Sequence, residues 1–170
     1  MEPLVPAGPA AEVIRQATAC HLTIATAESL TAGMVSAALG SVPGASAVLQ
    51  GGAVTYQNQI KVDILGVDPA GIAATGAVDA VVARQMAEGA RRVFDADLGV
   101  STTGAAGPEP HAGKAVGTVF VAVASAAGTT VNEYLFDGDR ESVRRHACAA
   151  ALNLLGAVFR DQAAGNKSQD

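Results

Sequence analysis

The sequence predicts an α/β domain in which helices cover both faces of a mixed, mostly parallel β-sheet. Segments with helical spacing of apolar residues alternate with short β-prone runs along most of the 170 residues, and two such runs form a hairpin near the end. Ala, Gly and Val dominate, while aromatic residues make up only 4%, which favours closely packed layers over an aromatic-cored sandwich. We expect a three-layer α/β/α sandwich with one antiparallel strand.

The first part of the chain supplies two strands and the helices around them. The expected elements are a helix over residues 10–20, a strand over 22–27, a helix over 28–39, a strand over 48–56 and a helix over 58–65. Asn58 is of a type that caps helices, and Gly66 is of the type that follows them. The pair Gly51-Gly52 inside a strand indicates a bulge or a close backbone approach.

The second part adds a helix, three strands and a last helix. The expected elements are a helix over 78–94, strands over 98–102, 116–125 and 130–136, a Gly/Pro-rich loop over 104–115, and a helix capped by Asp139. Residues 1–9 contain three prolines and are expected to form a flexible lead, and residues 163–170 a polar, frayed tail. A single domain over 10–162 follows.

Composition excludes several classes of protein. Hydrophobic residues make up 49% of the chain, and the net charge is −5 without a large Lys/Arg cluster, so we expect neither disorder nor nucleic-acid binding. No apolar run approaches the roughly 20 residues that span a bilayer, and no secretory signal is visible. A cytoplasmic protein with Cys20 and Cys148 reduced and buried is therefore expected.

Ser29 lies where the first predicted strand meets the following helix. Its hydroxyl would be close to unpaired backbone N–H groups and to the positive end of the helix dipole, which stabilise developing negative charge. The alternative is an ordinary helix cap at Ser29 or Thr31. The serine-hydrolase elbow Gly-x-Ser-x-Gly is absent, and so is Ser-x-x-Lys, because Ala32 holds the lysine position.

Lys61 is the candidate base for that serine, since a serine hydroxyl needs a base to remove its proton. The three histidines are less convincing, and no Cys/His cluster has the spacing of a metal site. A lysine acts as a base only if its pKa falls towards neutrality, and the apolar neighbours Ile60 and Val62 permit the burial this needs. A solvated surface lysine is the alternative. Tyr56 either orients the pair or is a strand-end aromatic.

A glycine-containing loop and two arginines are candidates for binding a phosphate. Backbone N–H groups after a strand can hold an anion, and the relevant stretch is Thr103-Gly104-Ala105-Ala106-Gly107-Pro108, which is not a Walker A loop. Arg140 and Arg144 are four residues apart and share a helix face, which permits a phosphate clamp or a solvated face paired with Glu141. The loops over 26–31, 56–61 and 103–115 are expected together at the carboxyl edge of the sheet.

These segments together resemble the CinA C-terminal domain family, whose members include nicotinamide-nucleotide amidase. The resemblance covers roughly residues 10–160. The matching stretches are Thr26-Ala27-Glu28-Ser29-Leu30-Thr31, Val42-Pro43-Gly44-Ala45-Ser46, Gly51-Gly52-Ala53-Val54-Thr55-Tyr56, Lys61 with Leu65-Gly66-Val67, Gly76-Ala77-Val78, Met86-Ala87-Glu88-Gly89-Ala90-Arg91, Thr103-Gly104-Ala105-Ala106-Gly107-Pro108 and Gly117-Thr118-Val119.

The resemblance implies a reaction and roles for residues. Nicotinamide mononucleotide and water would give nicotinate mononucleotide and ammonia, without a metal or other cofactor. By resemblance, Ser29 attacks the carboxamide, Lys61 takes its proton and Tyr56 assists, while the substrate-binding positions are Thr103, Gly104, Ala105, Gly107, Arg140 and Arg144. The resemblance also implies a homo-oligomer that binds a small nucleotide and does not associate with a membrane. In this family the domain is often fused to a larger one, and we expect the stand-alone form here.

Two stretches depart from the family pattern. Thr31-Ala32-Gly33 replaces Thr-Gly-Gly, and the loop continues as Pro108-Glu109-Pro110 instead of further glycine. The prolines stiffen the loop, and Glu109 brings a carboxylate near the expected phosphate. The alternative functions are therefore a catalytically inactive nucleotide-binding or regulatory module of the same fold, and an amidase acting on another small carboxamide.

Overall fold

The computed structural model describes residues 8–166, and residues 1–7 and 167–170 lie outside it. The predicted lead over 1–9 therefore falls mostly outside the described residues, although Pro9 already begins the first helix. The last helix continues through Asn166 and so includes the first four residues of the predicted polar tail. The predicted single domain is consistent with one five-stranded sheet covered by helices on both faces.

The sheet has the order β2-β1-β3-β4-β5. Its strands are β1 (Ile24–Glu28), β2 (Leu49–Val54), β3 (Leu98–Gly104), β4 (Thr118–Ser125) and β5 (Gly128–Leu135). β1 pairs in parallel with β2 and β3, whereas β4 is antiparallel to both β3 and β5. Four strands thus run in one direction and β4 runs in the other, which confirms the mixed sheet with one antiparallel strand.

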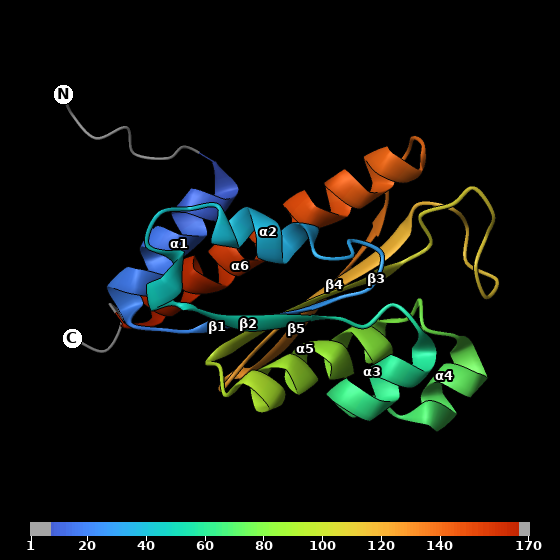
Figure 1. Ribbon diagram of the computed structural model, residues 1–170, viewed down its shortest axis with the longest axis horizontal. Coiled ribbons are helices and arrows are strands. Elements are labelled where there is room, and N and C mark those ends of the chain that lie inside the picture. The colour runs from blue at the N-terminus through green and yellow to red at the C-terminus, as the bar shows by residue number, and fades with distance from the viewer. Residues whose placement is uncertain (1–7, 167–170) are drawn as a thin grey trace.

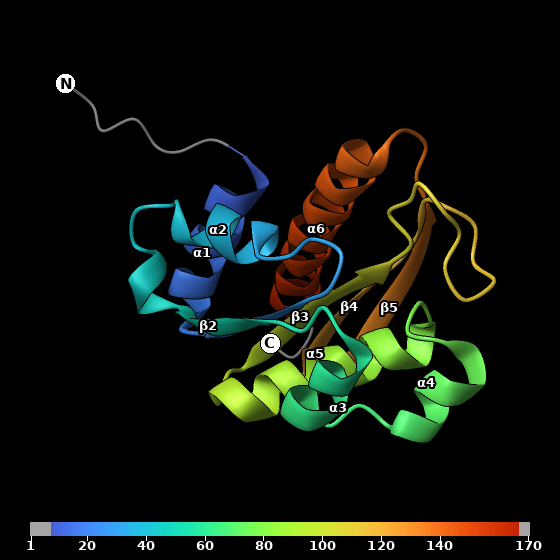
Figure 2. The same ribbon diagram turned by 45° about the vertical axis from the view of Figure 1, so that its right-hand side comes forward.

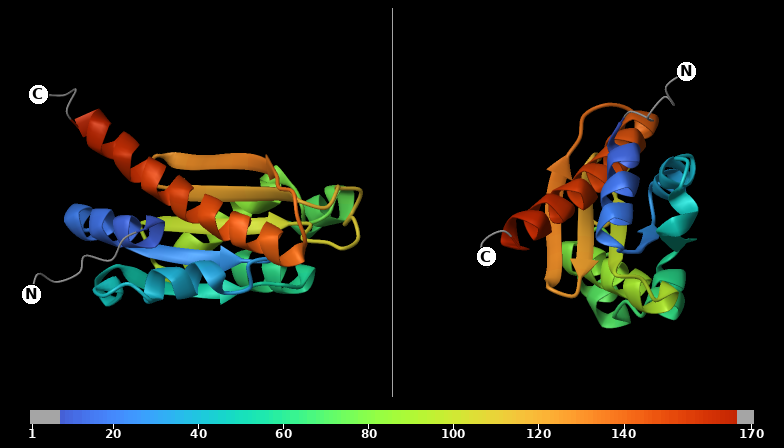
Figure 3. Two further views of the ribbon diagram at one scale, coloured as in Figure 1. Left: turned by 90° about the horizontal axis from the view of Figure 1, so that it is seen from above. Right: turned by 90° about the vertical axis from the view of Figure 1, so that its left-hand side faces the viewer.

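Helices form a layer on each face of the sheet, as Figures 1 and 2 show. α1 (Pro9–Cys20), α2 (Met34–Gly40) and α6 (Arg140–Asn166) cover one face, and α3 (Asn58–Leu65), α4 (Pro69–Thr75) and α5 (Ala80–Phe94) cover the other. The views from above and from the end in Figure 3 show α6 lying obliquely across the sheet. The three-layer sandwich predicted from the sequence is confirmed.

The apolar stripes of the helices face the sheet. Val82, Met86 and Ala90 on α5 are buried as their spacing predicts, whereas Val93 is 45% exposed.

Cys148 on α6 is buried, and burial together with the nearby Glu28 charge raises the pKa of its thiol to about 11. Cys20 is exposed, so the prediction that both cysteines are buried is wrong for Cys20.

Several helix boundaries differ from the sequence predictions. α2 begins at Met34 and not at Glu28, which is the last residue of β1. The cap of α3 is Gln57, and Asn58 is the first helical residue. α4 was not predicted at all, although Asp68 caps it by accepting a hydrogen bond from the Ala70 N–H at 2.9 Å. Its length of seven residues gives too few apolar repeats for a periodic signal.

The sequence predicted a bulge or a close approach at Gly51 and Gly52, and β2 shows both an irregular register and close packing there. A Cβ on Gly52 would collide with the Thr26 and Ser36 hydroxyls, and one on Gly51 would lie 2.8 Å from the Phe94 ring. The register between β1 and β2 also shifts between Ile24 and Ala25. The edge strand β2 therefore packs more closely here than any residue with a side chain would allow.

The strand directions bring distant loops together. Because β1, β2 and β3 are parallel, the residues that follow them leave the same edge of the sheet. β4 begins at this edge and β5 ends there, so the start of α6 joins the same edge. The carboxyl edge thus collects the loops over 26–31, 56–61 and 103–115, as the sequence predicted.

A buried carboxylate fixes the first of these loops. Glu28 is 1% exposed. Its Oε1 accepts hydrogen bonds from the Val35 N–H (2.8 Å) and the Thr31 hydroxyl (2.6 Å). Its Oε2 accepts from both the N–H (3.0 Å) and the hydroxyl (2.8 Å) of Ser36. One side chain at the end of β1 therefore holds the turn after it and the start of α2.

We expect the substitution Glu28→Gln to lower the free energy of unfolding by about 2–3 kcal/mol. The two side chains have the same shape, but whichever oxygen becomes the amide NH2 group then faces a backbone N–H donor that no longer has an acceptor. Urea unfolding measures the change. Glu12→Gln, at a partly exposed glutamate on the outer side of α1, is the control and should leave stability almost unchanged. Equal effects of the two substitutions would contradict this account of Glu28.

Candidate active site

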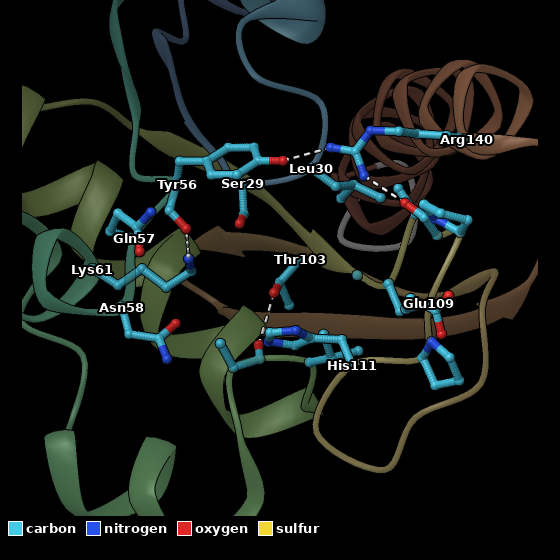
Figure 4. A pocket seen from close by; sticks show the side chains of 18 of the residues that line it. Ser29, Leu30, Tyr56, Gln57, Asn58, Lys61, Thr103, Glu109, His111 and Arg140 are labelled. Carbon is cyan, nitrogen blue, oxygen red and sulfur yellow. Dashed lines mark hydrogen bonds between the residues drawn. The ribbon is translucent and has the colours of Figure 1, made fainter.

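The carboxyl edge of the sheet holds a cavity of about 520 Å³. Its walls come from the turn after β1, the start of α3, the segment before α5, the loop after β3, and Arg140 of α6. This volume falls in the range of small-molecule sites, roughly 300–1,000 Å³. Figure 4 shows Ser29, Lys61 and Asn58 at one end of this pocket and Glu109 at the other. The structure therefore unites the three loops that the sequence singled out.

Ser29 lies in a partly exposed turn and not at a helix N-terminus. Its N–H donates to the Thr102 carbonyl at 3.0 Å, which ties the turn to β3, and its carbonyl accepts from the Ala32 N–H. The N–H groups at the start of α2 are occupied by Glu28. The predicted stabilisation of negative charge by that helix start is therefore wrong. The side chain of Ser29 lines the pocket.

Lys61 is 1% exposed, and its amine reaches the pocket from α3. Nζ donates to the backbone carbonyls of Thr55 (2.8 Å) and Tyr56 (2.9 Å), both neutral acceptors. Burial lowers the pKa of the Lys61 amine from its ordinary value of 10.5 to about 8. The amine faces the same space as the Ser29 hydroxyl in Figure 4. The solvated surface lysine is thereby excluded.

Arg140 joins two walls of the pocket. One terminal nitrogen donates to the Tyr56 hydroxyl at 2.6 Å, and the other donates to the Gly107 carbonyl at 2.7 Å. The planar guanidinium fork suits two acceptors at once. Tyr56 is 47% exposed, so this contact holds an otherwise free ring at the rim. Both side chains line the pocket, as predicted.

The loop after β3 contributes backbone more than side chains. The Thr103 hydroxyl is buried and donates to the Ala77 carbonyl at 2.7 Å, which joins β3 to the segment before α5. The Ala105 N–H donates to the Thr118 carbonyl. Gly104 is needed for packing, because a Cβ there would lie 2.8 Å from the Thr118 carbonyl, and Gly107 has a φ of +91°. All four residues line the pocket.

Arg144 does not line this pocket, which corrects its predicted place among the substrate-binding residues. Its Nε donates to the Leu30 carbonyl at 2.8 Å, and a terminal nitrogen lies 3.4 Å from the Thr31 carbonyl. It therefore supports the turn that carries Ser29 from behind. Glu141 pairs with Arg145 at 3.6 Å. Of the two candidate arginines, only Arg140 reaches the cavity.

Several residues of the pocket wall are not among the site residues that the sequence predicts. Gln57 and Asn58 lie at the start of α3, and His111 lies in the loop after β3. The sequence could have indicated Gln57 and Asn58, because polar residues about one turn before a candidate base lie on the same first helical turn.

Among residues 8–166, no group of three or more His, Cys, Asp or Glu side chains is placed to hold a metal ion. Within the same range, no helix is long and apolar enough to cross a membrane.

The fold and the pocket define the class first: a three-layer α/β domain whose site lies at the carboxyl edge of a mixed sheet. The family follows from comparison with known proteins. The family model described as the CinA C-terminal domain matches residues 7–159. The chain belongs to the CinA C-terminal domain family.

Relatives and solved structures agree with this assignment. A CinA-like protein of Anaeromyxobacter dehalogenans is 51% identical over 140 residues, 81% of this chain and 34% of the relative. A CinA-like protein of Frankia casuarinae is 43% identical over 133 residues, 78% of this chain and 31% of the relative. The chain thus spans about a third of the length of these curated relatives.

Among solved structures, a competence/damage inducible protein of Agrobacterium tumefaciens superposes with a TM-score of 0.84 at 36% identity, covering 91% of this chain and 98% of the other. A CinA superfamily protein of Klebsiella pneumoniae superposes with a TM-score of 0.87 at 29% identity, covering 90% and 96%. The described domain is therefore similar to these solved chains over nearly their whole length.

We expect the burial of Lys61 to make stability depend on pH. Below pH 8 the folded and unfolded chains both carry the charged amine, and the folded chain bears the full cost of burying it. Between pH 8 and 10.5 the unfolded chain binds more protons, so stability rises with pH, by about 3 kcal/mol at most. Denaturant unfolding at pH 7 and pH 10 measures this rise against Lys61→Met.

The Lys61→Met variant should lack this component, since the thioether does not titrate. Every other titrating group is common to the two proteins, so the difference between their unfolding free energies isolates Lys61. A difference that is the same at pH 7 and pH 10 would show that the amine keeps its ordinary pKa in the fold.

Proposed function

We propose that this chain is an amidohydrolase that converts nicotinamide mononucleotide and water to nicotinate mononucleotide and ammonia. The observation that supports it most directly is the buried Lys61 amine, with its pKa lowered to about 8, in the same pocket as the Ser29 hydroxyl. A lysine in this state has the property that a general base for serine requires. Membership of the CinA C-terminal domain family supports the choice of substrate.

The proposed reaction begins with the fraction of Lys61 that is neutral, roughly a tenth at pH 7 for a pKa of about 8. Neutral Nζ takes the Ser29 proton while Oγ attacks the carboxamide carbon. Protonated Lys61 then gives this proton to the departing ammonia, which leaves an acyl-enzyme on Ser29. Water hydrolyses the ester and restores the serine hydroxyl.

The negative oxygen of the tetrahedral intermediate needs hydrogen-bond donors other than the start of α2. Among the described residues of the pocket wall, several backbone N–H groups donate no hydrogen bond within the chain, and two of them belong to Leu30, which follows Ser29, and to Ala106. We propose that these two groups hold the oxyanion. Such a donor contributes roughly 2.7–4 kcal/mol of barrier reduction in enzymes where it has been removed.

The remaining pocket residues would hold the nucleotide. Thr103, Gly104, Ala105 and Gly107 form one wall, and Arg140 spans the rim with Tyr56 as its partner. In this arrangement Tyr56 would hold the Arg140 side chain at the rim of the pocket and orient the substrate. The nucleotide as partner and the association into a homo-oligomer stay predictions.

We expect Ser29→Ala to lower kcat for ammonia release from nicotinamide mononucleotide by at least about a thousandfold, because the nucleophile is lost. Lys61→Met should lower kcat by roughly 10²- to 10⁴-fold, the usual contribution of a general base. A coupled ammonia assay measures both. Ser41→Ala, an exposed serine at the end of α2, is the matched control and should keep wild-type activity.

The outcomes separate the two candidate functions. A nucleotide-binding or regulatory module without catalysis would bind the nucleotide and release no ammonia in any variant. A Ser29→Ala variant that retains its kcat would exclude Ser29 as nucleophile. Hydrolysis of a different carboxamide only, found with a panel of such compounds, would keep the mechanism and replace the substrate.

The pH dependence of kcat/KM gives a separate test of the base. Since the base must be deprotonated, kcat/KM should rise with pH, with an apparent pKa near 8, and reach a plateau above it. Steady-state rates between pH 6 and pH 10 measure the profile. A rise that continues towards pH 10.5 would mean that the group responsible is not a buried lysine.

A further inference from the structure

Glu109 lies at the outer end of the pocket, away from the reactive end. It lines the cavity and is exposed, and Figure 4 shows it across the pocket from Lys61 and Asn58. A substrate whose carboxamide is at Ser29 would extend its other end towards Glu109. The proposed catalytic steps do not use this carboxylate.

The loop holds Glu109 in a fixed place. Pro108 has a fixed φ, and Pro110 restricts the conformation of Glu109 itself. On one side the Gly107 carbonyl accepts from Arg140 at 2.7 Å. On the other side His111 and Lys114 exchange two backbone hydrogen bonds, at 3.1 and 2.9 Å. The carboxylate is therefore presented to a ligand with little loss of backbone freedom.

Among the described residues, Glu109 has no ion-pair partner at the outer end, and the nearest cation of the pocket wall, Arg140, is bonded to other groups. Arg140 directs a donor from each terminal nitrogen to the Tyr56 hydroxyl and the Gly107 carbonyl, and Lys61 is at the opposite end of the pocket. Since a carboxylate is an acceptor-only group, this end suits a ligand that brings hydrogen-bond donors and repels one that brings negative charge.

We propose that Glu109 determines substrate specificity by accepting sugar hydroxyls and disfavouring a phosphate, so that nicotinamide riboside competes with its 5′-phosphate as substrate. This rests on the proposed amidohydrolase function. Carboxylates accept hydrogen bonds from ribose hydroxyls in dinucleotide-binding domains, which shows that the pairing is chemically sound. The residue acts on binding of the remote part of the substrate and takes no part in bond breaking.

The size of the effect follows from the charges. Two like unit charges about 6 Å apart in a water-exposed site lower affinity roughly threefold, and a phosphate dianion about tenfold. Removing the charge should therefore favour the phosphorylated compound by about three- to tenfold, and added salt should reduce the difference.

The experiment compares kcat/KM for nicotinamide mononucleotide and nicotinamide riboside in the wild type and in Glu109→Gln. We expect the mononucleotide-to-riboside ratio to rise about three- to tenfold in the variant at low salt, and less at 0.5 M salt. Glu133→Gln is the control, because it makes the same charge change on β5 at a residue that does not line the pocket, and its ratio should equal that of the wild type.

Calorimetric binding of both compounds makes the outcomes distinguishable. If both bind and neither is hydrolysed, catalysis is wrong while the ratio of dissociation constants still tests Glu109. If both are hydrolysed and the ratio is unchanged in Glu109→Gln, or shifts equally in Glu133→Gln, only the role of Glu109 is wrong. If neither binds, both proposals are wrong.

Discussion

The buried carboxylate of Glu28 is the constraint on which the pocket depends. It ends β1, accepts the backbone donors of Val35 and Ser36 and receives the Thr31 hydroxyl. Because Thr31 uses its single proton on Glu28, its contact with Thr102 at 2.8 Å requires Thr102 to donate. One buried side chain thereby sets the direction of a hydrogen-bond chain from β1 to β3. Ser29 is held between these fixed points, since its own N–H is bonded to β3.

The second constraint is the burial of Lys61. An amine satisfied only by neutral carbonyls is costly to keep charged, and the same cost lowers its pKa towards the working range of a base. The carbonyls belong to the two residues that follow the edge strand β2, so the position of the amine depends on how β2 pairs with β1. The two glycines of β2 permit that close pairing. The burial of Lys61 thus lowers the free energy of unfolding and, at the same time, gives the amine the pKa that a general base needs.

Much of this architecture could be predicted from the sequence, because alternating helical and strand periodicities are local signals. The three loops at the carboxyl edge followed from strand direction alone. The start of α2 could not be predicted from such signals, because Glu28 caps it from the preceding strand, a contact set by tertiary packing. Arg140 and Arg144 looked equivalent on a helix face, and only the fold shows that one faces the cavity and the other supports the turn at Leu30. The apolar sequence neighbours of Lys61 likewise permitted its burial but did not determine it.

The contacts of α6 with the early loops have a consequence for the order in which the molecule matures. Arg140 reaches a tyrosine 84 positions earlier, and Arg144 reaches a carbonyl 114 positions earlier. Because domains generally fold as units, these contacts form only after both arginines have been synthesised. Until then the rim is open and the serine turn has no support from behind. α6 is translated after every other element that forms the pocket, so a chain that has not yet reached α6 lacks the arginine that closes the rim.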